Sequence, residues 1–97
     1  MNILKYAQPD RLVIIEFTSP VCTVCDNIKP FLQKLKNAYQ NKFTIVEVDA
    51  IANFSTAEQL FIQDLPTFIF LKDNKLVDRI NGFIGENKFE KIVRIYI

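Results

Sequence analysis

The run L-V-I-I-E-F, residues 12–17, constrains the fold of this chain more than any other stretch. It is short, almost continuously apolar and rich in β-branched side chains. Such a run is typical of a central strand that is covered on both faces. A second run, F-T-I-V-E-V at residues 43–48, predicts another strand, and apolar residues recur between the two at helical spacing from about Thr23 to Gln40. This order indicates a parallel βαβ unit with a right-handed crossover.

The second half of the chain contains two more helical segments. The stretch T-A-E-Q-L-F-I-Q, residues 56–63, predicts a short helix that is capped by Ser55 or Thr56. From Glu86 onward, apolar residues again recur at helical spacing, so we expect a last amphipathic helix there.

Between these two helices the sequence predicts a β-hairpin. Segments 68–72 and 75–80 are the expected strands, and Asp73 and Asn74 between them tolerate the left-handed backbone of a tight turn. The hairpin adds two antiparallel strands to the βαβ unit. We therefore expect an α/β fold with a mixed four-stranded sheet, helices on both faces, and a single domain spanning residues 1–97.

Composition excludes several classes of function. The chain has 97 residues, no histidine and two cysteines, which rules out Ser-His-Asp and Cys-His catalysis. Two cysteines are too few soft ligands for a zinc or iron–sulfur site within one chain, and a shared site would need a dimer that nothing in the sequence suggests. We therefore expect a monomer with no metal and no bound cofactor.

Charge and hydropathy favour a cytoplasmic protein. The net charge of +1 comes from 12 basic and 11 acidic residues spread along the chain, which gives no field to gather nucleic acid or an anionic membrane. No apolar run approaches the roughly 20 residues that cross a bilayer, and the first ten residues lack the features of a signal peptide. We expect neither nucleic acid nor membrane as a partner.

Cys22 and Cys25 lie in S-P-V-C-T-V-C-D, at the junction of the first strand and the first helix. The N-terminus of a helix favours an anion, so the pKa of the Cys22 thiol should be lowered and Cys22 should attack disulfides. Cys25 lies one turn further on, more buried and close enough to form a disulfide, and it would resolve the mixed disulfide. The alternative is a pair of core cysteines without chemistry.

The chain also resembles the thioredoxin family. The resemblance is carried by E-F-x-x-x-x-C-x-x-C-x-x-x-x-P, then by L-P-T leading into F-I-F-L-K-D-N, and then by N-G, and it runs from about Leu12 to Ile95. It implies a thioredoxin-like fold and a thiol–disulfide oxidoreductase that reduces disulfides of client proteins. It also implies re-reduction by an NADPH-dependent thioredoxin reductase. Thioredoxins have an additional N-terminal strand, for which little sequence precedes Leu12, so we expect that strand to be shortened or missing.

The resemblance assigns further site residues. Pro66 matches the cis-proline that faces the disulfide in this family, and Leu65 matches the residue whose backbone pairs with an extended substrate. Gly82 matches a glycine that lets a substrate approach closely, although a plain loop glycine is equally compatible with the sequence. The residues around the cysteines complete the expected substrate-binding set: Val21, Thr23 and Val24.

Glu16 matches the buried acid, usually an aspartate, that the family keeps beneath the disulfide. A carboxyl group in such an apolar run is costly to bury in its charged form, so its pKa should be raised toward neutral. Glu16 would then accept the proton of Cys25, unless strand alternation points it to solvent. Glu47 matches a family lysine, so it either raises the pKa of Glu16 further or points outward without effect.

The motif V-C-T-V-C departs from the W-C-G-P-C of thioredoxins, and the chain has no tryptophan. Strong oxidants of this superfamily often carry histidine between the cysteines, where its charge stabilises the reduced thiolate. Thr23 and Val24 cannot do this, and Asp26 opposes a thiolate, so we expect a reducing disulfide.

Several alternatives stay open. Without the tryptophan and the Gly-Pro pair, the electron donor could differ from a thioredoxin reductase, and a dedicated client is a further alternative. The chain could instead be a non-catalytic module that binds an extended peptide beside Pro66. An oxidant or isomerase of the same fold is the third alternative, which the reduction potential would distinguish.

Overall fold

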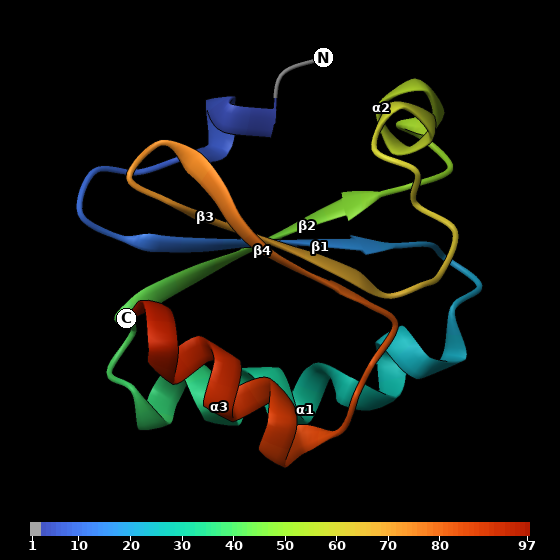
Figure 1. Cartoon of the computed structure of the whole chain (residues 1–97). Coiled ribbons are helices and arrows are strands. Elements are labelled where there is room, and N and C mark those ends of the chain that lie inside the picture. The colour runs from blue at the N-terminus through green and yellow to red at the C-terminus, as the bar shows by residue number, and fades with distance from the viewer. Residues whose placement is uncertain (1–2) are drawn as a thin grey trace.

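The predicted strands form one sheet, in the order β2-β1-β3-β4, in the computed structural model, which describes residues 3–97 (Figure 1). The strands are β1 (Leu12–Thr18), β2 (Phe43–Asp49), β3 (Thr67–Lys72) and β4 (Lys75–Asn81). Strand β1 pairs in parallel with β2 and antiparallel with β3, and β3 pairs antiparallel with β4. The expected mixed sheet is confirmed, and β1 lies inside it.

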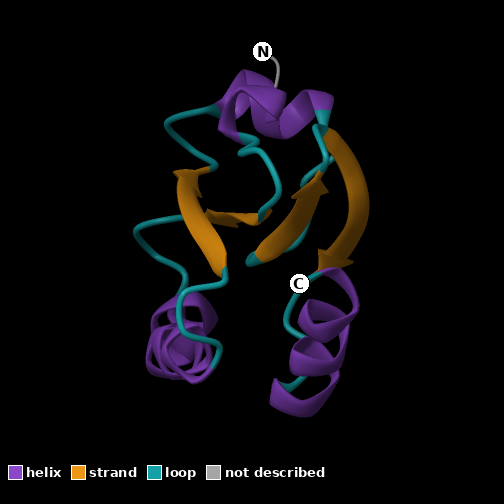
Figure 2. Cartoon of the chain, turned by 90° about the vertical axis from the view of Figure 1, so that its left-hand side faces the viewer, coloured by secondary structure: helices purple, strands orange, loops and turns teal. Residues whose placement is uncertain are grey.

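Helices cover both faces of this sheet, as predicted. Helices α1 (Thr23–Ala38) and α3 (Glu86–Tyr96) lie on one face (Figure 1). The short 3-10 helix η1 (Ile3–Tyr6) and helix α2 (Phe54–Gln59) lie on the other face, and Figure 2 shows the sheet between the two layers.

Side chains along β1 alternate between two hydrophobic cores. Leu12 and Ile14 pack into the core beneath α1 and α3. Val13 and Ile15 pack into the core on the side of η1 and α2, and all four side chains are fully buried. Since successive side chains of a strand point to opposite faces, Glu16 follows Leu12 and Ile14 toward the α1 and α3 layer.

The core beneath α1 and α3 is rich in aromatic rings. Phe68 of β3 and Phe89 of α3 meet edge to face, with ring centroids 4.7 Å apart. Phe31 of α1 also meets Phe89 edge to face, at 6.0 Å. Such pairs add to the stabilisation that comes from burying the rings. Phe89 of α3 therefore stabilises the packing of α3 against both α1 and the sheet.

Helix α1 begins at Thr23, as predicted, but it ends at Ala38 rather than at Gln40. Gln40 and Asn41 have φ of 54° and 57°, in the left-handed region where a right-handed helix cannot continue. The N–H of Asn41 donates to the carbonyl of Lys36 at 2.9 Å and closes the helix end.

The prediction of a helix at residues 56–63 with a cap from Ser55 or Thr56 is wrong in its bounds and in its cap. The structure has α2 at Phe54–Gln59, so Ser55 and Thr56 lie inside the first turn rather than before it. The residue before the helix is Asn53, whose side chain makes no capping hydrogen bond.

Local turn chemistry accounts for both ends of α2. At its start, Oδ1 of Asp49 accepts hydrogen bonds from the backbone N–H groups of Ile51 at 2.8 Å and Ala52 at 3.1 Å. This turn redirects the chain directly after β2, so the helix begins early. At its end, Phe61 has a left-handed backbone with φ of 54°, which stops the helix.

Two further expectations are confirmed. Among residues 3–97, the segment before β1 contains η1 and no strand, so the N-terminal strand of the resembled family is missing there. Asp73 and Asn74 have φ of 52° and 62°, as a tight hairpin turn requires.

None of the helices between residues 3 and 97 combines the length and hydrophobicity needed to span a bilayer.

Candidate active site

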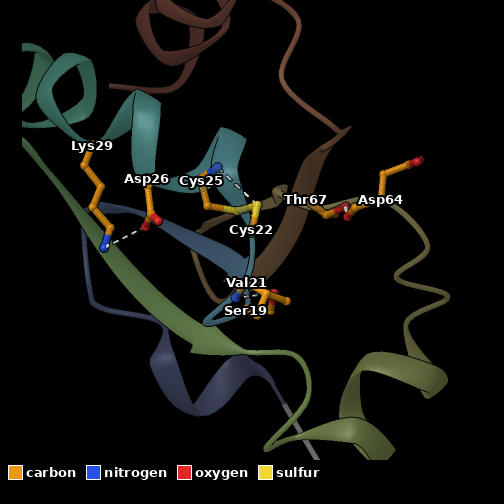
Figure 3. Close-up of a disulfide and its surroundings, with 8 residues drawn as sticks. All are labelled: Ser19, Val21, Cys22, Cys25, Asp26, Lys29, Asp64 and Thr67. Atoms are coloured by element: carbon orange, nitrogen blue, oxygen red, sulfur yellow. Dashed lines mark hydrogen bonds and ion pairs between the residues drawn. A yellow bond between two sulfur atoms is a disulfide. The ribbon is translucent and has the colours of Figure 1, made fainter.

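The two cysteines lie at the N-terminus of α1 and form a disulfide (Figure 3). Cys22 is the N-cap residue, and its Sγ accepts a hydrogen bond of 3.1 Å from the backbone N–H of Cys25. Their Cα atoms are 5.3 Å apart, the distance of one helical turn. The N–H of Cys25, in the first turn of α1, therefore points at the sulfur of Cys22, where it would stabilise a thiolate.

The two sulfurs differ in access to solvent. Cys22 is half-buried, whereas Cys25 is only 1% exposed. The predicted asymmetry is confirmed: an incoming group can reach Cys22, and Cys25 lies protected behind it. Val21 and Val24 on either side are 84% and 46% exposed, which leaves an apolar rim around the accessible cysteine.

The segment before β3 lies next to the disulfide in Figure 3. The Leu65–Pro66 peptide bond is cis, as the resemblance implies. Pro66 is buried and Leu65 is half-buried. The hydroxyl of Thr67 donates to the carbonyl of Asp64 and fixes the turn that leads into the strand.

Gly82 follows β4 directly and has φ of +79°, which accounts for glycine at this position. An added Cβ would meet no atom within 4 Å, so the space above this backbone is open. The role of Gly82 toward a substrate stays a prediction. Thr23 begins α1 and is exposed beside Cys22.

Glu16 lies on β1 and is 1% exposed, so its burial is confirmed and the solvent-facing alternative is wrong. Its Oε2 is buried and has no hydrogen-bond partner among residues 3–97. The pKa of Glu16 is raised to about 7. Burial is the main cause, the charge of Glu47 acts in the same direction, and the charge of Lys29 acts against both.

A surface pocket of about 420 Å³ opens beside Glu16, between α1 and strand β2. Glu47 lines it and pairs with Glu16 in the register of β1 and β2. Glu47 therefore acts on Glu16 electrostatically, although its own side chain is exposed. Lys29 and Lys36 of α1 form the opposite wall. The sequence analysis assigned Lys29 no role at the site; its place four residues after Cys25, on the same helix face, was the available signal.

No group of three or more potential metal ligands occurs within residues 3–97. The site is thus built from a disulfide at a helix N-terminus, a cis-proline segment beside it, and a buried carboxyl group on the neighbouring strand. This arrangement can exchange a disulfide and move a proton.

Comparison with known proteins places the chain among thioredoxins. The family model for thioredoxin matches residues 3–95. Thioredoxin of Bacillus subtilis is 29% identical over 88 residues, which cover 91% of this chain and 85% of that protein. Thioredoxin H4 of Arabidopsis thaliana is 29% identical over 90 residues, covering 93% and 76%.

The fold agrees with this relationship. The crystal structure of thioredoxin f2 from Chlamydomonas reinhardtii superposes with a TM-score of 0.82 at 26% identity, covering 96% of this chain and 87% of that one. The fold is therefore thioredoxin-like, with the four-stranded mixed sheet described above. With its C-x-x-C disulfide at the N-terminus of α1, the chain belongs to the thioredoxin family of oxidoreductases.

Proposed function

We propose that this protein reduces disulfides of client proteins by dithiol–disulfide exchange. The observation that carries the proposal is the position of Cys22. Its sulfur caps α1 and accepts the N–H of Cys25, while Cys25 is buried one turn away. A thiolate at Cys22 would gain from the same N–H group, and the thiolate is the attacking species in disulfide exchange.

The reaction has two exchange steps. The Cys22 thiolate attacks one sulfur of the client disulfide, forms a mixed disulfide, and releases the other client sulfur as a thiolate. Cys25 then loses its proton and attacks the sulfur of Cys22, which frees the second client thiolate. Two electrons pass from the protein dithiol to the client, and the protein ends with the Cys22–Cys25 disulfide.

Glu16 is proposed as the proton acceptor of Cys25. Its carboxyl group points toward the layer that contains α1, on which Cys25 lies, and it is buried without a partner at Oε2 among residues 3–97. With a pKa of about 7, Glu16 can take up a proton and return it near neutral pH. A carboxyl group of ordinary pKa would stay charged and would bind the proton poorly.

The client is proposed to lie as an extended segment beside Leu65 and Pro66, and to pass close to Gly82. The exposed side chains of Val21 and Val24 offer apolar contact on the other side of Cys22. Thr23 completes this surface. An extended segment suits such a site because backbone hydrogen bonds recognise it regardless of sequence.

The direction of electron flow is proposed from the residues around the cysteines. No histidine exists to stabilise the reduced form, and Asp26 stands directly after Cys25. An NADPH-dependent thioredoxin reductase is the proposed electron donor, as is general for the family. The cytoplasmic location, the monomeric state and the single domain over residues 1–97 stay predictions.

The first test is a redox titration of the Cys22–Cys25 pair in dithiothreitol and glutathione buffers, read by thiol alkylation and mass. We expect a midpoint below the cytosolic glutathione potential. A midpoint well above it would indicate an oxidant or isomerase instead. Failure to form any disulfide would contradict the catalytic interpretation altogether.

A pair of variants completes the test. Cys22→Ser should abolish reduction of a disulfide-bonded protein such as insulin, whereas Cys25→Ser should accumulate a mixed disulfide that mass spectrometry detects. If Cys22→Ser leaves function unaffected, the protein is a binding module that does not use its cysteines.

A further inference from the structure

An apolar groove of about 490 Å³ runs along α2 on the face of the sheet opposite α1 and α3. Of the described residues that line it, Glu58 alone has an ionisable side chain. Three large apolar side chains of the groove are mostly exposed: Ile51 (63%), Phe54 (64%) and Phe61 (76%). Leaving three such side chains in water forgoes hydrophobic stabilisation that burial would give.

Phe61 is also held in an unfavourable backbone conformation. Its φ of 54° lies in the left-handed region, where glycine and asparagine are favoured and a bulky aromatic residue is uncommon. Such strain persists only where the surrounding structure enforces it. Packing of the ring does not enforce it, because three quarters of this side chain is exposed.

Arg79 of β4 holds the backbone of this turn. Its Nη1 donates to the carbonyl of Leu60, and its Nη2 donates to the carbonyl of Phe61 at 2.8 Å. Its Nε donates to Oδ1 of Asn81 at 2.7 Å, which orients the guanidinium. Three donors of the planar guanidinium are in use, so Arg79 fixes the positions of both carbonyls. The direction of the Phe61 side chain is fixed with them.

The groove is continuous with the site at the disulfide. Leu65 lines the groove and directly precedes the cis-proline Pro66. Asp64 and Thr67, which flank Leu65 and Pro66 in the chain, lie beside Cys22 in Figure 3. A client segment that contacts Leu65 would therefore have Cys22 on one side and the rings of Phe61 and Phe54 on the other. The apolar lining matches apolar side chains better than charged ones, because a charge buried there would find no partner of opposite sign except Glu58.

We propose that Phe61, together with Phe54 and Ile51, binds an aliphatic or aromatic side chain that an extended client segment carries near its disulfide. The clients would then be proteins whose cysteine is flanked by apolar residues. Arg79 is the positioning residue that keeps Phe61 in place. This inference rests on the proposed disulfide reductase function and adds the class of client that the reductase selects.

The test compares two disulfide-bonded peptides that differ only in the residues flanking one cysteine, Leu-Phe in one and Ser-Asn in the other. Oxidised glutathione serves as a third substrate that is too small to reach the groove. The rate constant for reduction by the dithiol form is measured by quenching and mass. We expect the Leu-Phe peptide to react about tenfold faster than the Ser-Asn peptide, the factor that partial burial of one large apolar side chain supplies.

The variant Phe61→Asn should remove this preference and leave the rate with glutathione unchanged. Because asparagine tolerates the left-handed backbone, the variant should unfold at the same temperature as the parent chain or higher. Phe54→Asn changes the same groove from a position without backbone strain and should also reduce the preference. Ile95→Asn on α3 is the matched control, since Ile95 is 69% exposed on the opposite face of the sheet.

An unchanged preference in both groove variants would overturn the proposal while the reductase function stands. A wild-type protein that reduces neither the peptides nor glutathione would instead contradict the proposed function. Sedimentation gives a further check: a concentration-dependent dimer that Phe61→Asn dissociates would assign the groove to a second copy of this chain and overturn its assignment to clients.

Discussion

The two helical layers of this molecule differ in how completely they cover the sheet. Helices α1 and α3, of 16 and 11 residues, cover one face, and their aromatic core is closed around Phe89. Within residues 3–97, the other face has only η1 and α2, of four and six residues. There the large side chains of Phe54 and Phe61 stay in water.

This difference indicates a division of roles. The two long helices contribute six buried residues, against two from α2, and the cysteines lie at the N-terminus of α1. The short helix α2 contributes less to burial and instead exposes an apolar surface next to the same site. Variants on the two faces should therefore differ in whether they change stability, proton transfer or client choice.

The largest contrast is expected between two phenylalanines. Phe89→Ala should lower the free energy of unfolding by about 3–5 kcal/mol, because it removes a fully buried ring and leaves a cavity. Phe54→Ala should change it by less than about 0.5 kcal/mol, since that ring is mostly exposed. Urea unfolding of both variants measures this. Equal costs would show that the α2 face carries as much packing as the α1 and α3 face.

The second prediction concerns pH on the α1 face. The pKa of Glu16 is raised in the folded protein from 4.5 to about 7, so the folded state binds its proton more tightly than the unfolded chain does. The stabilisation that protonated Glu16 contributes is complete below pH 4.5 and is lost as the pH rises from 4.5 to 7. The total loss in the free energy of unfolding is about 3 kcal/mol. Glu16→Gln should abolish that part of the pH dependence.

Urea unfolding of the oxidised protein at several pH values between 4 and 8 measures the effect. The difference between parent and Glu16→Gln isolates Glu16, because the other carboxyl groups titrate in both proteins. Glu58→Gln, on the other face of the sheet, is the matched control and should leave the slope unchanged. A parallel pair of curves for parent and Glu16→Gln would contradict the raised pKa.

Much of this arrangement could be predicted from the sequence because local patterns determine it. The apolar run at residues 12–17 identified the central strand. The spacing of Cys22 and Cys25 at a strand–helix junction placed the disulfide at the helix N-terminus. In these cases the residues that set the structure are neighbours in the chain.

The α2 region was predicted less well because distant residues and turn geometry determine it. The stretch from Phe54 to Ile62 has an apolar pattern that continues past the observed helix end. The backbone of Phe61 stops the helix, and Arg79, eighteen residues later, holds that turn. No spacing rule links Arg79 to those carbonyls, so the groove could not be anticipated.

The third prediction tests whether Arg79 and Phe61 act together. Arg79→Gln should lower the free energy of unfolding by about 1 kcal/mol, because the carbonyls of Leu60 and Phe61 lose their donors and turn partly to water. In a Phe61→Gly background the cost should be smaller, since glycine adopts this backbone without support. A double-mutant cycle in urea gives the coupling. Additive costs would mean that Arg79 does not hold the strained turn.

Substitution of Lys29 should have the smallest effect on stability of the changes considered. Its effect on the pH dependence nevertheless reports directly on the pKa of Glu16. Lys29 and Asp26 form an ion pair of 3.6 Å whose side chains are 55% and 66% exposed, so Lys29→Met should change the free energy of unfolding by no more than about 0.5 kcal/mol. The charge of Lys29 lowers the pKa of Glu16, so its removal should raise that pKa and extend the pH-dependent loss of stability to higher pH. Lys34→Met, on the exposed side of the same helix, is the control. If both lysine variants shift the pH dependence alike, the shift reflects the net charge of α1 rather than the pocket beside Glu16. The pKa of Glu16 would then not be under local control, and this difference between the α1 face and the α2 face would disappear.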